Sequence, residues 1–337
     1  MRRLLIALAA YTAFVVPGVA VADEPVKFAL STPTDLSRNG VYVWVDAFRK
    51  AFERTGREIR IYPNGSLGGD QERVDQMRLG LLEMNVTNPD EISRHSPTYY
   101  GIAMPFLFQS YDHMDRFLEQ TPFVPQVNSE LSAAGQDFRF VDIAYTGAMV
   151  GLLTRKVPVR TVDDLKKIRL RFLSAPDLKL FAAWGVRGVQ VSWGEVAQGL
   201  QTGMIDGYLN PPAVATMFGH GSVLDYFTDL RMGPSGRMIV VSTRWLESLT
   251  PEERAVFDSA VLEARTANRT WNRHYIAKER DALARVGIDW VEPSGSERQT
   301  WKDRTVNFYD QKWYDPAKTE QVGRWIKDTA EGPNDSH

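Results

Sequence analysis

VKFALSTPTDLSRNGVYVWVDAFRKAFERTGREIRIYPNGSLGGD, residues 26–70, sets the architecture of the chain. It opens on the apolar run 26–30, which is typical of a strand. Apolar residues then recur at helical spacing across residues 41–52, and Gly56 follows, where a left-handed helix cap favours glycine. The apolar positions between residues 59 and 63 predict a second strand. Strand, helix and strand in this order indicate the beginning of an α/β sheet.

The loop at the end of this stretch leads into a second predicted helix. Asp70 follows two glycines and is expected to cap a helix that carries Val74, Met77 and Leu81. Two more strands are expected, at residues 138–145 and 149–154.

The strongest helix start in the chain lies much later. Thr250 is a helix-capping residue, Pro251 occupies the first helical position, and Glu253 completes a capping box. No convincing helix breaker follows before Ala284. A helix of that length, at about 1.5 Å per residue, spans roughly 50 Å and is long enough to cross two domains.

The N-terminus has the pattern of an export signal. Arg2 and Arg3 precede an apolar segment, and Ala20-Val21-Ala22 is a cleavage pattern, so removal of residues 1–22 is expected. The remaining length predicts about two domains. The formal net charge of −2 gives no reason to expect nucleic acid as a partner. The chain has no cysteine, which excludes zinc-finger, iron–sulfur and thiol-nucleophile chemistry and fits an exported bacterial protein of the periplasm.

The sequence offers no catalytic set. None of the five histidines has the spacing of metal ligands, and the phosphate-loop, dinucleotide and nucleophile-elbow motifs are missing. Glu195 is explained by a Ser-x-x-Glu capping box that begins at Ser192. We therefore expect no catalytic residue, no metal ligand and no cofactor.

Residues 163–212 instead indicate a binding site for a carboxylate. Arg171 lies between apolar neighbours on a predicted strand, and a buried arginine needs either an internal ion pair or a ligand anion. Arg169 is two residues away on the same strand face. Asn210 ends a turn-rich loop with a free amide, and Trp193 and Tyr208 are candidate walls of the pocket, although core packing explains single aromatics equally well.

Several fragments in a fixed order resemble one known family, the solute-binding proteins of tripartite ATP-independent periplasmic (TRAP) transporters, of the C4-dicarboxylate-binding type. The fragments are YPNGSLGGD (62–70), QMRLGLLEM (76–84), MPFLF (104–108), DDLKKIRLR (163–171), WGE (193–195), LQTGMIDG (200–207) and Asn210-Pro211. Each fragment is weak alone, but their order and spacing are specific, and they cover nearly the whole mature chain.

The resemblance implies a two-lobed α/β periplasmic binding protein fold with a central ligand cleft and a long helix that spans both domains. It implies that Arg171 holds the ligand carboxylate and that Asn210 lies in the cleft. The expected boundaries are listed by lobe: 23–145 with 235–275 for lobe I, 146–234 with 276–330 for lobe II, and 331–337 for a loose tail.

The chain departs from the family pattern at two places. Residues 147–151 lack an arginine that many members carry, and Tyr208-Leu209 replaces a polar pair. Both changes favour a monocarboxylate with an apolar or aromatic body, unless Arg155 or Arg187 supplies the missing charge.

The sequence therefore predicts a periplasmic, monomeric binding protein that captures a small organic acid and delivers it to TRAP membrane subunits. Three alternatives remain open at this point. The first is an exported hydrolase or lyase that uses Glu195 or His113, and the second is a binding subunit that serves a chemosensor. The third is a metal-bridged ligand held with Trp193, Glu195 or Tyr208.

Overall fold

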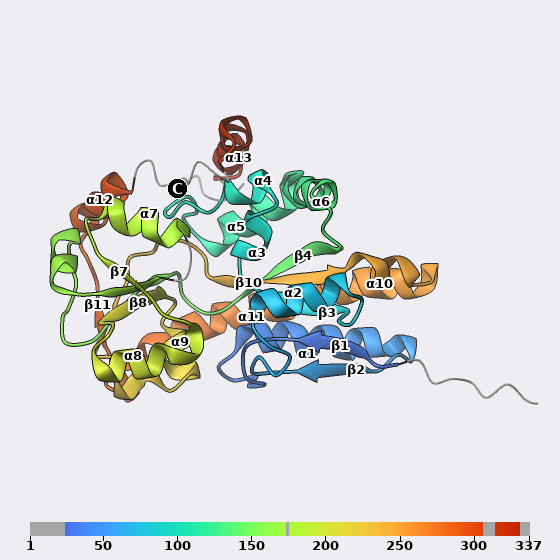
Figure 1. The fold of residues 1–337 in the computed structure, drawn as a ribbon, viewed down its shortest axis with the longest axis horizontal. Coiled ribbons are helices and arrows are strands. Elements are labelled where there is room, and N and C mark those ends of the chain that lie inside the picture. Colours follow the sequence, from blue (N-terminus) through green and yellow to red (C-terminus); the bar gives the residue numbers. More distant parts are fainter. Residues whose placement is uncertain (1–23, 173–174, 306–313, 331–337) are drawn as a thin grey trace, which may run out of the picture.

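The structure is a computed structural model of the 337-residue chain, and it describes residues 24–172, 175–305 and 314–330. The expected signal peptide, with its cleavage after Ala22, and the expected tail 331–337 lie outside these residues. Two sheets form two lobes, and one long helix runs between them (Figure 1). None of the helices in the described ranges combines the length and apolar composition that a membrane span requires.

The sheet of lobe I has five strands in the order β2-β1-β3-β10-β4. The strands are β1 (Val26–Ala29), β2 (Ile59–Tyr62), β3 (Met84–Thr87), β4 (Phe138–Tyr145) and β10 (Gly236–Ser242). β1 runs parallel to β2 and β3, whereas β10 runs antiparallel to β3 and β4. The end of β1, the end of β3 and the beginning of β10 therefore lie at the same edge of the sheet.

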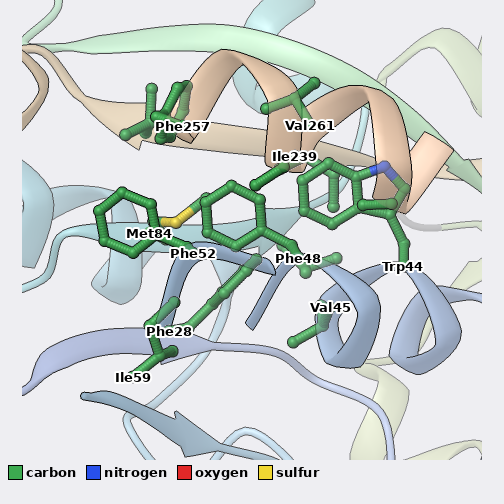
Figure 2. Close-up of a cluster of buried hydrophobic side chains, with 14 of the residues drawn as sticks. Phe28, Trp44, Val45, Phe48, Phe52, Ile59, Met84, Ile239, Phe257 and Val261 are labelled. Atoms are coloured by element: carbon green, nitrogen blue, oxygen red, sulfur yellow. The ribbon is translucent and has the colours of Figure 1, made fainter. Parts of the chain in front are cut away.

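Helices cover the faces of this sheet (Figure 1). They are α1 (Gly40–Phe52), α2 (Asp70–Arg78), α3 (Asp90–Ser93), α4 (Pro97–Tyr100), α5 (Tyr111–Gln120), α6 (Phe123–Ala133) and α10 (Thr243–Ser248). The apolar positions predicted at helical spacing, including Trp44, Phe48 and Phe52, are fully buried. The Phe48 ring stacks on Trp44 and Phe52, with ring centroids 5.4 and 5.7 Å apart, and Figure 2 shows this cluster closed by Phe257 and Val261.

The sheet of lobe II has six strands in the order β11-β9-β5-β8-β6-β7. They are β5 (Gly151–Thr154), β6 (Leu170–Phe172), β7 (Gly188–Gln190), β8 (Gly207–Asn210), β9 (Tyr226–Thr228) and β11 (Asp289–Val291). Its helices are α7 (Ala175–Ala183), α8 (Val196–Thr202), α9 (Ala213–Met217) and α12 (Gly295–Arg304). β6 and β8 are parallel and β5 is antiparallel to β8, with Gly151 opposite Asn210.

Two extended segments connect the lobes and are hydrogen-bonded to each other. The segment 146–150 leaves β4 and enters β5, and the segment 229–235 leaves β9 and enters β10. The hydroxyls of Thr146 and Ser235 lie 2.8 Å apart, and the backbone N–H of Val150 donates to the Gly233 carbonyl at 3.0 Å. These connections turn the edge of sheet I described above toward the edge of sheet II that carries the end of β8 and the start of β5.

The long helix α11 (Pro251–Arg285) crosses from lobe I to lobe II (Figure 1). Its predicted start is confirmed, because the Thr250 side chain accepts from the N–H of Glu253 and Glu253 accepts from the N–H of Thr250. The side chains of Asn268, Asn272 and Glu279 accept hydrogen bonds from Tyr145, Gly147 and Ala148, and so attach the helix to the first connecting segment.

The last helix and the place of Asp70 differ from the sequence expectation. The last helix, α13 (Pro316–Asp328), packs with Val322 and Ile326 into the core of lobe I, although residues 276–330 were expected in lobe II. Asp70 is the first residue of α2 rather than its cap, because Gly69 takes the capping position. The Asp70 carboxylate is engaged instead by two arginines, described below.

Candidate functional site

Arg171 lies on β6, near the edge of sheet II that faces lobe I. The side chain is 8% exposed, and its Nε donates to the carbonyl of Val191 at 2.9 Å. Its guanidinium carbon lies 5.4 Å from the ring centroid of Trp193. Within residues 24–172, 175–305 and 314–330 it forms no ion pair with a carboxylate. A buried cation whose contacts among the described residues are a carbonyl and a ring is suited to binding an anion from outside the chain.

Electrostatics at Arg171 follow from this burial. Desolvation lowers the pKa of Arg171, while the nearby Asp177 opposes that shift and the charge of Arg237 adds to it. Arg237 belongs to β10 of lobe I, so this contribution comes from the other lobe and is smaller than that of the burial.

Trp193 and Tyr208 form one aromatic cluster but differ in exposure. Trp193 is half-buried and makes edge contacts with Tyr208 and Phe218, at 5.8 and 5.1 Å between ring centroids. Tyr208 is fully buried, and its hydroxyl lies 2.8 Å from Nδ1 of His220. Burial raises the pKa of Tyr208 and lowers that of His220. Tyr208 therefore supports Trp193 from behind, whereas Trp193 itself retains exposed surface.

Asn210 ends β8, opposite the start of β5. The side chain is half-buried, and its amide forms no hydrogen bond with the residues that the structure describes. Since β8 lies beside β6, this amide belongs to the same sheet edge as Arg171. A fixed cation and an open amide on neighbouring strands provide complementary donors for a ligand with several oxygens.

Arg169 lies just before β6 and has different surroundings. Its Nε donates to Asp206 at 3.0 Å, its backbone N–H donates to the same carboxylate at 2.9 Å, and its carbonyl accepts from the N–H of Asp206. The side chain is 53% exposed. The structure thus does not bring Arg169 to the partners of Arg171, and it gives Arg169 a local role in holding the start of β8.

A second polar group lies in lobe I and was not anticipated. Nη2 of Arg237 lies 3.3 Å from both carboxylate oxygens of Asp70 and 3.3 Å from Oγ of Ser31. Arg73 holds the same carboxylate at 2.7 Å. Burial alone would raise the pKa of Asp70, but Arg237, Arg73 and a hydrogen bond from Asn88 hold it below its usual value. The sequence contains an indication of a partly buried charge here. Arg237 directly precedes the apolar strand residues MIVV, and Arg171 lies between apolar residues of another strand.

The two arginines considered as alternative cations do not reach this region. Arg155 donates through Nη1 to the carbonyl of Leu200, and Arg187 is exposed just before β7.

The residues named for the hydrolase or lyase alternative, Glu195 and His113, both make contacts with their own chain. Glu195 is exposed and accepts from the Ser192 hydroxyl at 2.5 Å. His113 is buried, with Nε2 2.8 Å from the carbonyl of Ile326 and its ring against Phe108. Over the described part of the chain, no three histidine, aspartate or glutamate side chains gather as a metal site.

Comparison with known proteins identifies the family of this chain. The sequence model of the family described as "Bacterial extracellular solute-binding protein, family 7" matches residues 37–315, which confirms the family expected from the motifs. A curated relative, the uncharacterized protein YiiZ of Salmonella typhimurium, is 26% identical over 263 residues, covering 77% of this chain and 78% of its own.

Two solved structures share the fold. A TRAP periplasmic solute-binding protein from Xanthobacter autotrophicus, with bound β-D-galacturonate, gives a TM-score of 0.79 at 20% identity and covers 90% of this chain and 99% of its own. A TRAP periplasmic solute-binding protein from Haemophilus influenzae, with bound L-gulonate, gives 0.81 at 20% identity and covers 90% and 99%. The predicted two-lobed α/β fold with a long spanning helix is therefore confirmed.

Proposed function

Because the chain belongs to family 7 of the bacterial extracellular solute-binding proteins, we propose that it captures a small organic acid by its carboxylate between the two lobes. It then delivers the acid, in the periplasm, to the membrane subunits of a TRAP transporter. The observation that carries this proposal is Arg171, a buried guanidinium that has no carboxylate partner in the described part of the chain.

The roles of the other groups follow from their positions. Arg171 binds the two carboxylate oxygens with its planar fork of donors. Asn210 donates to and accepts from further ligand oxygens, and Trp193 covers one side of the acid while Tyr208 fixes the Trp193 ring. Arg169 keeps the loop before β8 in place through Asp206.

The charge balance favours one carboxylate. Arg171 forms no ion pair with a carboxylate of the described residues, so one ligand carboxylate can pair with it. A second carboxylate would be buried with no counter-charge of its own, which is costly. The ligands named for the two solved relatives, β-D-galacturonate and L-gulonate, each have one carboxylate.

A thermal-shift screen of organic acids tests the proposal. The panel contains D-galacturonate, L-gulonate, tetrahydropyran-2-carboxylate, succinate, malate and fumarate. A ligand at about 100 times its dissociation constant stabilises the folded state by roughly 2.7 kcal/mol. We expect the monocarboxylates to raise the unfolding temperature more than the three dicarboxylates.

The same screen on two variants identifies the carboxylate contact. Arg171→Lys keeps the charge but loses the planar fork, so it should respond weakly or not at all. The exposed Arg187→Lys is the matched control and should respond as the wild type does. A full response of Arg171→Lys would show the carboxylate assignment to be wrong. A response of the wild type to succinate alone would contradict the preference for a single carboxylate.

A further inference from the structure

The carboxyl group of Glu279 lies where three parts of the molecule meet. Glu279 belongs to α11, which crosses both lobes, and its Oε2 accepts from the backbone N–H of Ala148 at 2.7 Å. Ala148 belongs to the first connecting segment between the lobes. The N–H of Ala213, the first residue of α9, is also close enough to act on the carboxyl group. One side chain therefore links the spanning helix to a connection and to a helix of lobe II.

The space around this carboxyl group is filled in the arrangement that the structure shows. Glu279 is 1% exposed. Gly147 has a φ of +117°, and a Cβ atom at this position would lie 2.8 Å from Oε1 of Glu279 and 3.1 Å from Cβ of Ala213. This close approach, at a positive φ, requires glycine at position 147. A change in the angle between the connecting segment and α11 would separate Gly147 from the carboxyl group and admit water.

The carboxyl group lacks the partners that its ionised form needs. An ionised carboxylate accepts hydrogen bonds at both oxygens. Oε1 of Glu279 is buried and has no hydrogen-bond partner within the described residues, and no cation of these residues forms an ion pair with either oxygen. Burying an unpaired charge is costly, so the neutral, protonated carboxyl group suits this position better than the carboxylate.

The charged neighbour of Glu279 strengthens this preference. Burial raises the pKa of Glu279 to about 8, the backbone N–H groups of Ala148 and Ala213 oppose the shift, and the negative charge of Asp229 adds to it. Asp229 lies on the second connecting segment and is itself paired with Arg231 at 3.3 Å and with Arg298 at 3.7 Å. The nearest charge is therefore of the same sign as the carboxylate.

The other groups that face Glu279 stay neutral while it titrates. They are Tyr111 of α5 and Tyr275 of α11. Burial raises the pKa of both tyrosines, and the charge of Glu279 adds to both shifts. The connecting segment 146–150 and α9 contain no titratable side chain. Proton exchange at this place near neutral pH therefore belongs to Glu279.

The parts that contact Glu279 lead directly to the proposed ligand site. Asn210 ends β8, and Ala213 begins α9 three residues later, after two prolines. The first connecting segment enters β5 at Gly151, which pairs with Asn210. A movement at the Glu279 carboxyl group therefore reaches the Asn210 amide through both of the strands that position it.

We propose that the proton on Glu279 stabilises the arrangement of the two lobes that the structure shows, and that its loss favours arrangements in which water reaches the carboxyl group. Glu279 is then a positioning residue, which acts on Asn210 through Ala148 and Ala213. The effect on the lobes is independent of the proposed function, whereas the effect on ligand affinity rests on it. Because the folded pKa is raised, the stabilising effect is complete at low pH and is lost as the pH rises through about 8.

Titration calorimetry at about pH 7 and about pH 9 measures the effect on affinity, with D-galacturonate or the best acid of the screen. The protonated fraction of a group with a pKa of about 8 falls about tenfold between these values, so the wild-type Kd should rise about tenfold. Glu279→Gln keeps an acceptor for Ala148 but does not titrate, so its Kd should stay within about twofold. The exposed Glu252→Gln on the same helix is the control and should follow the wild type.

The arrangement of the lobes is measured without ligand. Because the chain has no cysteine, the exposed Ala133 of lobe I and Gln201 of lobe II can both be replaced by cysteine and spin-labelled. Double electron–electron resonance then gives the distances between the labels. We expect a second distance to appear between about pH 7 and about pH 9 when Glu279 is present and not in Glu279→Gln. Gly147→Ala forces a Cβ atom against the carboxyl group and should show the second distance already at about pH 7.

Equal pH dependence of the label distances in the wild type and in Glu279→Gln would overturn the inference, and so would unchanged distances in both. Equal pH dependence of Kd in the two proteins would overturn its consequence for affinity. If no acid of the panel binds at either pH, the proposed function fails, and the label distances alone decide on Glu279. If Glu279→Gln does not fold, as judged by circular dichroism, the distances in Gly147→Ala at about pH 7 decide instead, and wild-type distances there would overturn the inference.

Discussion

Arg169 and Arg171 have the same charge and lie two residues apart, but the strand gives them different surroundings. Arg169 is paired with Asp206 on the surface, whereas Arg171 is buried beneath Trp193. The pair with Asp206 is exposed, and such pairs contribute little to stability. Charge in the sequence is therefore a poor guide to the site until burial and partners are known.

The first prediction at this scale concerns Arg169→Ala. We expect the free energy of unfolding to fall by less than about 1 kcal/mol, because the backbone bonds between Arg169 and Asp206 survive the change. Affinity for the best acid should stay within twofold of the wild type. Urea denaturation and calorimetry measure both quantities, and a large loss of affinity would return Arg169 to the binding site.

The sequence predicts the burial of Arg171, but it does not predict the ion pairs of Asp70 in lobe I. The burial of Arg171 is predicted because it has apolar neighbours on both sides. Asp70 follows two glycines, a pattern that predicts a helix cap. This local pattern gives no indication of the arginines with which Asp70 forms ion pairs. Arg237 lies 167 residues away from Asp70. No local pattern reports a contact across that separation, which depends on the packing of β10 beside β3.

At the scale of the element, α11 shows what a pattern does and does not predict. Its capping box and uninterrupted length predict a helix from Thr250 to about Ala284, and the structure has Pro251–Arg285. Its role as the attachment for the connecting segment depends on buried polar side chains at 268, 272 and 279. By contrast α2 ends earlier than expected, at Arg78, and Leu81 is exposed.

Glu279 is the most unusual group on this helix. It is 1% exposed, its Oε2 accepts from the N–H of Ala148, and its Oε1 has no partner within the described residues. Burial raises the pKa of Glu279 to about 8, although the nearby backbone N–H groups of Ala148 and Ala213 oppose this shift. The folded state therefore binds this proton more tightly than the unfolded chain does.

The raised pKa of Glu279 determines how the unfolding free energy changes with pH. The stabilising contribution of the protonated carboxyl is complete below the ordinary pKa of 4.5 and is lost as the pH rises through about 8. Glu279→Gln keeps an acceptor for Ala148 and removes the titration. Across this pH range we expect the unfolding free energy of the wild type to fall through this group and that of the variant not to do so. The two should differ by a few kcal/mol at most.

Urea denaturation at several pH values between about 5 and 8 measures this difference. The exposed Glu252→Gln on the same helix is the control, and its pH profile should follow the wild type. A Glu279→Gln profile that falls as steeply as that of the wild type would contradict the account of this residue.

At the scale of the whole molecule, the residues that the structure describes join the two lobes by two short connecting segments and one long helix. Lobe II presents Arg171 and Asn210, and lobe I presents Arg237, Asp70 and Ser31. In the proposed function, neither lobe alone binds the whole acid. A ligand that contacts both lobes favours the arrangement in which they are closest, and binding should therefore shift the molecule toward a closed state.

Small-angle scattering with and without saturating acid tests this central claim most directly. The account predicts a smaller radius of gyration when the wild type is mixed with D-galacturonate or the best acid of the screen. Arg171→Ala should keep the radius of the unliganded protein at the same acid concentration, and Arg187→Ala should contract as the wild type does. An identical wild-type radius with saturating acid, or contraction of Arg171→Ala equal to that of the wild type, would contradict it.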